Sequence, residues 1–477
     1  MKILLAALLV VISLPPADAQ TLKETSEQIE GLPLGMYGAF NDVLYTGTNE
    51  CIYVTGKESI VGAFDAALVK VNSDLKVLWT TERTEGFLCA AKFANNIIVF
   101  STEDWKKNTA DFIKTIHAKL IDLQTGKTIR EKDVYKVSDR LYVQPHLLTD
   151  SAANFQYLEI RYTKQDKFIY FSAAKREEAL RGTTKIDLLS LTDNLDAKSV
   201  TLDISSLKTV TYDGSISDSK GDLFVVSHSM NSVMVEQYQN MQPAVVTGLK
   251  VKASFPEDAE VGGIISHGKK DDEIMVLLRT RGDVSSIATA RFNFETKQVY
   301  SDVTAGKQLP LKQDPDLILV GFEYYKDKII ILSEKFGIRQ ALMTNNKTTV
   351  RYFCGDMHVS VCDSNFTLIK DVVVKKLAEF NIDVGLRSGY KISGDQLFVL
   401  SNTMPGALHI EIKYAVVDLN ALTLHDGMIE NTKAKGNGAI VGSETLWFNK
   451  TALTPLIIDR SITSTRKFDN ILQKIEF

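Results

Sequence analysis

The sequence predicts an all-β fold built from about eight similar four-stranded antiparallel units. Three observations support this prediction: a short apolar pattern recurs eight times, turn-forming residues bound each copy, and long amphipathic helical patterns are scarce. The chain has 477 residues, of which 44% are hydrophobic and 24% are charged, a composition typical of globular proteins. One domain of this length is possible, because repeats escape the usual limit on the size of a single core.

The recurring pattern consists of a polar turn, then three to five apolar residues, and then usually Ser or Thr. Successive copies lie on average about 56 residues apart, from Ile52 to Leu446. The apolar residues are mostly β-branched or aromatic and do not alternate with polar ones, so each copy predicts a strand covered on both faces. The eight copies occupy residues 49–55, 95–101, 166–172, 221–227, 272–277, 327–333, 394–401 and 443–448.

Each copy is expected to follow one strand and to precede two more, all joined by polar turns. Residues 158–162 are the expected strand before the third copy, and residues 67–71 and 76–79 are the strands expected after the first. A sheet of this kind cannot cover both of its own faces, whereas sheets arranged radially cover one another. The sequence therefore predicts a β-propeller of about eight blades. The alternatives are seven blades with an appendage and a pair of stacked β-sandwiches.

The N-terminus has the three-part layout of a secretory signal peptide. Lys2 supplies a positive start, residues 3–14 are apolar apart from Ser13, and small residues precede an expected cleavage site after Ala19. The apolar run is well short of the roughly 20 residues that span a bilayer, and no later segment is long enough either. We therefore expect a secreted or periplasmic protein with no membrane span in the mature chain.

This organisation predicts three regions. Residues 1–19 form the signal peptide, residues 20–37 form a lead segment, and residues 38–477 form a single propeller domain. The lead segment is a candidate for the closing strand of the last unit, which covers residues 438–477. The net charge of −4, from 55 basic and 59 acidic residues, shows no basic excess, so nucleic acid is not an expected partner.

Four cysteines follow the expected cleavage site, and an exported protein with an even number can form disulfides. Cys354 and Cys362 flank a short segment and are the favoured pair. A bond between Cys51 and Cys89 is less favoured, because both lie inside apolar strands where a cysteine is often a small buried residue. The spacing of the cysteines does not match a structural zinc site.

Residues 38–477 resemble, in architecture alone, exported bacterial β-propeller proteins of unassigned activity. Residues 118–130, with Asp122 and the triplet 125–127, look like the outer hairpin of quinoprotein propellers. Those propellers repeat a tryptophan docking pattern in every blade, whereas this chain has only Trp79, Trp105 and Trp447. A quinone dehydrogenase is therefore disfavoured, and no cofactor is expected.

No residue is identified as catalytic, cofactor-binding or metal-binding. Residues 281–283 spell an Arg-Gly-Asp tripeptide, which we interpret as turn chemistry. Glycosylation sequons begin at Asn346, Asn365 and Asn449. Tyr162, Tyr324 and Tyr325 are candidates for stacking on sugars, with strand packing as the alternative. The histidines are scattered, and each is expected to be hydrogen-bonded or solvent-facing; they are His117, His146, His228, His267, His358, His409 and His425.

The function predicted from these features is that of a non-enzymatic exported propeller. It would bind a protein or glycan partner through the loops of one face or at the central channel. The alternative is a hydrolase or lyase that acts on extracellular polysaccharide, with acids or a histidine converging at the propeller axis. Convergence of polar side chains from several blades in a deep funnel would favour the enzyme.

Overall fold

The structure is a computed structural model. It describes residues 23–27, 43–45, 49–58, 64–102, 115–136, 142–150, 153–163, 183–203, 211–239, 246–256, 261–280, 286–301, 309–342, 348–380, 387–406, 409–429, 438–442, 445–448, 450–459 and 468–477. The predicted signal peptide, the third copy of the apolar pattern, the tripeptide at 281–283 and the sequons at Asn346 and Asn449 lie outside these residues. Within them, no helix has the length and apolarity needed to cross a membrane.

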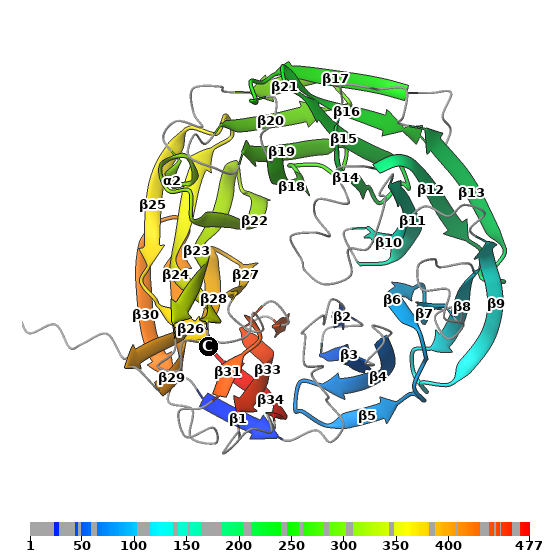
Figure 1. Ribbon diagram of the computed structural model, residues 1–477, viewed down its shortest axis with the longest axis horizontal. Coiled ribbons are helices and arrows are strands. Elements are labelled where there is room, and N and C mark those ends of the chain that lie inside the picture. The colour runs from blue at the N-terminus through cyan, green and yellow to red at the C-terminus, as the bar shows by residue number, and fades with distance from the viewer. Residues whose placement is uncertain are drawn as a thin grey trace, which may run out of the picture.

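Eight antiparallel sheets are arranged radially around a central axis, as Figure 1 shows. Over the described residues, six sheets have four strands and two have five. In seven of the sheets the strands follow chain order, with the first nearest the axis and the fourth outermost. The prediction of an eight-bladed β-propeller is confirmed. The predictions of seven blades with an appendage and of stacked sandwiches are wrong.

The first four blades consist of β2 (Val43–Tyr45), β3 (Glu50–Glu58), β4 (Phe64–Asn72) and β5 (Val77–Thr80); β6 (Phe87–Phe93), β7 (Asn96–Ser101), β8 (Thr115–Asp122) and β9 (Thr128–Lys136); β10 (Tyr142–Thr149), β11 (Phe155–Thr163), β12 (Thr183–Leu191) and β13 (Ala197–Asp203); and β14 (Thr211–Ser217), β15 (Leu223–Ser229), β16 (Ser232–Tyr238) and β17 (Val246–Lys252).

Blade 5 consists of β18 (Val261–His267), β19 (Glu273–Thr280), β20 (Ile287–Asn293) and β21 (Gln298–Ser301). Blade 6 is preceded by α2 (Pro310–Gln313) and consists of β22 (Leu317–Tyr325), β23 (Lys328–Leu342), β24 (Thr348–Asp363), β25 (Leu368–Val374) and β26 (Ala378–Phe380). Blade 7 consists of β27 (Gly389–Ser393), β28 (Gln396–Gly406), β29 (His409–Asp418) and β30 (Thr423–Ile429). Blade 8 consists of β31 (Gly438–Ile440), β32 (Leu446–Phe448), β33 (Thr451–Asp459), β34 (Phe468–Glu476) and β1 (Lys23–Glu27).

The apolar cores lie between neighbouring blades. All eight residues of β19 are buried, which is why its sequence shows no alternation. Phe224 and Val226 of blade 4 share one apolar cluster with Ile274 and Val276 of blade 5. Each second strand is covered on both faces because a blade packs on either side of it. Ring closure is therefore what removes these faces from water.

The ring closes with a strand from the N-terminal lead segment. Strand β1 pairs antiparallel with β34, with Lys23 opposite Glu476 and Glu27 opposite Leu472. It takes the outermost position in blade 8, next to the last strand of the chain (Figure 1). The two ends of the chain are thus joined in one sheet by main-chain hydrogen bonds.

Two segments were assigned to the wrong strand position. In blade 3 the second position belongs to β11, which contains the segment 158–162 that was expected to be the first strand. In blade 8 the last copy forms β32, which pairs with β33 on the axial side, so β33 occupies the second position. Both errors arise because apolarity reports burial and does not report strand order within a blade.

Three outer hairpins have the same type of turn, in which a buried apolar residue adopts a positive φ. Leu75, Leu195 and Phe366 have φ values of 64°, 59° and 64° and are at most 1% exposed. The left-handed conformation costs about 1–2 kcal/mol, which burial of a large apolar side chain offsets. In each turn a polar side chain accepts hydrogen bonds from two main-chain N–H groups; the acceptors are Asn72, Thr192 and Asp363.

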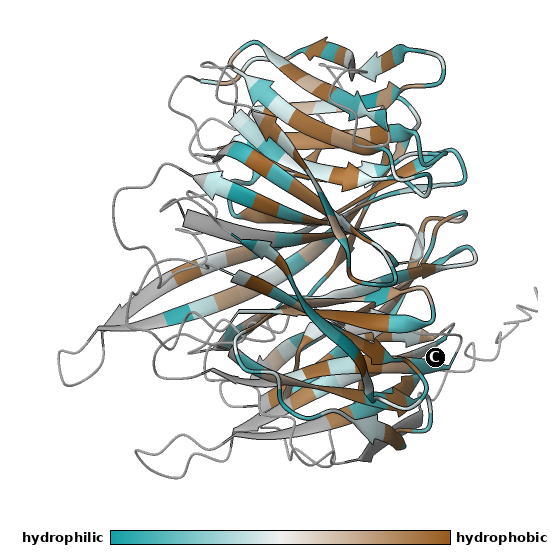
Figure 2. Cartoon of the chain, turned by 90° about the vertical axis from the view of Figure 1, so that its right-hand side faces the viewer, coloured by the Kyte–Doolittle hydropathy of each residue, from teal (hydrophilic) through white to brown (hydrophobic). Residues whose placement is uncertain are grey.

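The two faces of the ring differ. On one face, which we call the short-turn face, turns join the first strand to the second and, in most blades, the third to the fourth. These turns are hydrophilic and project to the right in Figure 2. On the opposite face the second strands end and the third strands begin. The two faces are therefore built from different classes of connection.

Polar residues near the ends of the second strands hold neighbouring blades together. The Asn402 amide of blade 7 donates to the Ile440 carbonyl and accepts from the Ile440 N–H of blade 8, both at 2.8 Å. Arg279 of blade 5 donates to the main-chain oxygens of Leu317 and Asp314 next to blade 6. Asn402 and Arg279 therefore each bind the adjacent blade. Similar contacts at Glu159 and Glu334 are described below.

Candidate functional site

A pocket of about 400 Å³ lies between blades 2, 3 and 4 on the short-turn face. Such a volume is within the range of sites that hold small ligands. The ends of β6, β11, β12 and β13 form it together with the turn between β14 and β15. Its lining residues are Phe93, Phe155, Gln156, Tyr157, Ser190, Leu191, Lys198, Lys220 and Gly221.

One wall of the pocket is aromatic and rigid. The rings of Phe93 and Phe155 pack edge to face, with centroids 5.8 Å apart. The hydroxyl of Tyr157 donates to the main-chain oxygen of Gly221 and so joins blade 3 to blade 4. Burial, with smaller contributions from two nearby aspartates, raises the pKa of Tyr157 to about 12, so this phenol stays protonated at neutral pH.

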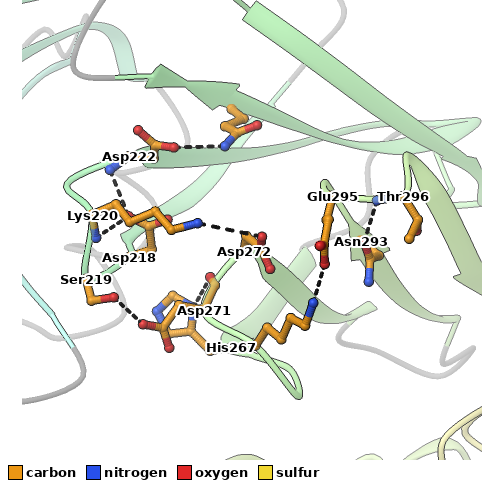
Figure 3. Close-up of polar contacts among 12 residues, drawn as sticks. Asp218, Ser219, Lys220, Asp222, His267, Asp271, Asp272, Asn293, Glu295 and Thr296 are labelled. Carbon is orange, nitrogen blue, oxygen red and sulfur yellow. Dashed lines mark hydrogen bonds and ion pairs between the residues drawn. The ribbon is translucent and has the colours of Figure 1, made fainter.

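The charged residues that line the pocket are both lysines. Lys198 and Lys220 are exposed, and the rest of the lining is apolar or neutral. Figure 3 shows that Lys220 also approaches blade 5, where its Nζ lies 3.9 Å from Asp272 Oδ2. In the same region Ser219 donates to Asp271 at 2.6 Å. Both charges in the lining are thus positive, although Asp218, Asp222 and Asp272 lie close behind it.

A second site lies between blades 3 and 4, close to the axis. Glu159 of β11 is fully buried and accepts hydrogen bonds from Arg161 at 3.0 Å, from Ser215 at 2.9 Å and from the Tyr212 hydroxyl. His146 lies on the innermost strand β10, with Nδ1 3.4 Å from the same carboxylate. Since 48% of the His146 side chain is exposed, solvent reaches the histidine but not the carboxylate.

This network keeps Glu159 ionised. Burial by itself would raise the pKa of Glu159, but the positive charge of Arg161 and the hydrogen bonds from His146 and Arg161 outweigh burial, and its pKa lies well below the ordinary range. The guanidinium of Arg161 also stacks over the Tyr212 ring, 5.2 Å from its centroid. A buried carboxylate behind an accessible imidazole is an arrangement that can orient the ring for proton transfer.

The favoured disulfide does not form in this structure. Cys354 and Cys362 lie on the same strand, β24, where both are buried and free. Eight residues of extended strand separate them by roughly 26 Å, whereas a disulfide needs Cα atoms within about 7 Å. The error came from interpreting residues 355–361 as a loop. Cys51 and Cys89, on β3 and β6 of different blades, form no disulfide either.

The described histidine side chains are hydrogen-bonded or exposed, as expected. His117, His228 and His358 each place Nδ1 within 2.5–2.7 Å of an aspartate on the adjacent strand of the same blade. Both ring nitrogens of His267 lie within hydrogen-bonding distance of main-chain oxygens. His425 is exposed on β30. No group of three or more potential ligands for a metal ion occurs among the residues the structure covers.

The aromatic candidates do not gather into one site. Tyr162 is 1% exposed, and its hydroxyl lies 2.7 Å from that of Tyr135, so packing explains it. Tyr324 and Tyr325 lie at the end of β22 in blade 6, far along the ring from the pocket. Asn365 is exposed in the turn between β24 and β25.

Sequence reasoning missed both sites. The second site, around Glu159, did leave a signal in the sequence. Residues 159–161 read Glu-Ile-Arg, which places two opposite charges inside an otherwise apolar strand. Such charges are rarely buried unless they are paired. The pocket had no local signal, because its lining comes from three blades.

No family model matches the chain, and no curated protein matches it. Among solved structures, the Dos1 propeller is 8% identical, with 95% of this chain and 94% of that chain covered and a TM-score of 0.45. The WD40 domain of SCAP from fission yeast is 10% identical, with coverages of 89% and 94% and a TM-score of 0.39. The Pyrococcus horikoshii acylaminoacyl peptidase is 10% identical, with coverages of 89% and 58% and a TM-score of 0.39. These similarities assign no activity.

Proposed function

We propose that this chain is an exported binding module and that the pocket between blades 2, 3 and 4 holds an acidic glycan. Export rests on the N-terminal signal pattern. A propeller suits a binding role because its rigid blades present turns and loops at fixed positions. The observation that supports the ligand class is the pocket lining, which combines aromatic rings with two lysines.

Each part of the lining matches one part of an acidic sugar. The apolar face of a sugar ring packs on aromatic side chains such as Phe93. Gln156 and Ser190 supply hydrogen-bonding groups for the sugar hydroxyls. Lys198 and Lys220 attract the carboxylate of a uronic acid, although Asp272 competes for Lys220. Because both lysines are exposed, we expect the attraction to weaken as salt is added.

Replacing both lysines, as Lys198→Ala with Lys220→Ala, is expected to weaken binding of oligogalacturonate or oligoalginate roughly 5- to 30-fold. This range corresponds to about 0.5–1 kcal/mol for each exposed charge. Isothermal titration calorimetry at low and high salt measures the effect. Lys250→Ala is the matched control, because Lys250 is exposed on the outer strand β17 away from the pocket. Equal binding of a neutral dextran oligomer, or an unchanged affinity in the double variant, would contradict an acidic ligand.

A hydrolase or lyase that acts on polysaccharide near the axis is the second candidate. The observation that favours it is the pair formed by half-exposed His146 and buried Glu159 on the inner strands of blade 3. In this mechanism His146 exchanges a proton with the substrate, and Glu159 orients the imidazole.

If the protein depolymerises acidic polysaccharides, His146→Asn is expected to lower kcat by about 10²- to 10⁴-fold. Reducing-end and unsaturated-product assays measure the rate. His117→Asn is the control, because His117 also pairs with an aspartate but lies on the third strand of blade 2. Turnover that survives in His146→Asn would exclude this histidine, and a lack of turnover in the unaltered protein would exclude the enzyme on those substrates.

A further inference from the structure

Blade 6 contains a lysine, a cysteine and a glutamate packed together in the protein interior. Lys376 follows β25, Cys354 lies on β24 and Glu334 lies on β23. Lys376 Nζ is 3.2 Å from Cys354 Sγ, and it forms an ion pair with Glu334. The side chains of Lys376 and Glu334 are 0% exposed, and so is Cys354.

The surrounding contacts hold the three groups in place. Ser388, next to β27 of blade 7, donates to Glu334 through its hydroxyl at 2.6 Å and through its main-chain N–H at 3.3 Å. The main-chain N–H of Lys376 donates to Asp356 Oδ1 at 3.1 Å. Apolar side chains cover the thiol on the other side, from Ala378, Phe336 and Met404. The amine and the thiol are therefore kept in contact by neighbours on several strands.

We propose that Cys354 and Lys376 form an oxygen-bridged covalent cross-link, Nζ–O–Sγ, when the protein is exposed to dioxygen. The amine and the thiol each lose one hydrogen atom. One oxygen atom of O₂ enters the bridge, with new N–O and O–S bonds. The other oxygen atom leaves as water with the two hydrogens. The nitrogen and sulfur are oxidised, and dioxygen is the oxidant that is reduced.

The structure supplies three conditions for this reaction. Glu334 contacts Lys376 Nζ and is therefore placed to accept the ammonium proton when the amine reacts. Dioxygen is small and apolar and can enter an apolar interior that excludes larger oxidants. Cys362 is the other thiol in the described part of blade 6, and it lies eight residues further along the same strand, too far away to compete for Lys376.

The cross-link is expected to form slowly. Burial and the neighbouring Glu334 charge raise the pKa of the Cys354 thiol, so little of it is thiolate at neutral pH. Accumulation over days of aeration, and reversal by a thiol reductant, are therefore expected. Once formed, the link joins β24 to the segment after β25 and should raise the urea midpoint of unfolding.

The test is a tryptic map of the full protein after aeration, compared with protein kept anaerobic with dithiothreitol. Trypsin would release residues 352–370 linked to residues 376–387, with the cleavage after Lys376 blocked. The linked mass should exceed the sum of the reduced peptides by about 14 Da, from one oxygen gained and two hydrogens lost. Fragment ions distinguish Cys354 from Cys362 within the first peptide.

Two variants control the result. Cys354→Ser should abolish the linked peptide, and Cys362→Ser, at the other buried cysteine of β24, should retain it. Full alkylation of Cys354 after prolonged aeration would overturn the proposal. A link to Lys375, a direct link about 2 Da below the sum of the reduced peptides, or a disulfide between Cys354 and Cys362 would overturn it as well.

Discussion

Replacing Arg161 with leucine is expected to lower the free energy of unfolding by about 3–5 kcal/mol at pH 7, because the change leaves the Glu159 carboxylate buried without its cation. In the native chain Glu159 is fully buried, and the Arg161 side chain is 8% exposed. Of the remaining partners, Ser215 and Tyr212 donate hydrogen bonds from neutral groups, and His146 is half-exposed at 3.4 Å, so none replaces the buried cation. Equilibrium urea unfolding at pH 7 measures the loss.

The loss should shrink as the pH falls. In the unaltered protein the pKa of Glu159 is below its unfolded value of about 4.3, so the pair contributes stability above that pH and loses it as the pH falls through the folded pKa. In Arg161→Leu burial is no longer outweighed, and the pKa of Glu159 rises. The carboxyl then takes up a proton at mildly acidic pH, which removes the buried charge. We therefore expect the two urea midpoints to lie closer together at pH 4.5 than at pH 7.

Lys132→Ala is the matched control for Arg161→Leu. Lys132 Nζ lies 2.5 Å from Asp196 Oδ1, but the two side chains are 46% and 61% exposed. Exposed pairs of this kind contribute about 0–1 kcal/mol. A loss below about 1 kcal/mol in Arg161→Leu, or a difference between the midpoints that widens toward low pH, would mean that Arg161 does not compensate the buried charge of Glu159.

Replacing Lys376 with methionine is the second large change, with an expected loss of about 3–5 kcal/mol. Methionine keeps much of the length and volume but leaves Glu334 buried and without its cation. Burial opposes the charged form of Lys376, and the Glu334 charge outweighs it and raises the pKa of the lysine above its ordinary value. Lys376 is therefore charged at neutral pH in the reduced protein.

The adjacent residue provides a control for Lys376. Lys375 pairs with Asp356 at 2.6 Å, but its side chain is 75% exposed, so Lys375→Met should change the free energy of unfolding by no more than about 1 kcal/mol. The double variant Lys376→Met with Glu334→Leu removes both charges and should recover much of the loss. If the double variant is less stable than Lys376→Met alone, the buried charge is not the cause.

Much of the fold could be predicted from local patterns. Runs such as 223–226 and 274–277 are apolar without alternation because both of their faces are covered, and they became β15 and β19. The repetition of such runs predicted the ring. Local patterns failed where two neighbouring runs competed for one position, as at 158–162 and 166–172. They failed again where an apparent loop, 355–361, proved to be part of the long strand β24.

The sequence by itself determined the architecture, because turn chemistry and burial leave marks within a few residues of each strand. The tertiary structure alone decided which polar side chains meet. Glu159 contacts Tyr212 across 53 positions, and Lys376 reaches Cys354 and Glu334 from the segment between β25 and β26. Such contacts depend on how one blade packs on the next and on strand register within a blade. Neither quantity is encoded by a short stretch of residues.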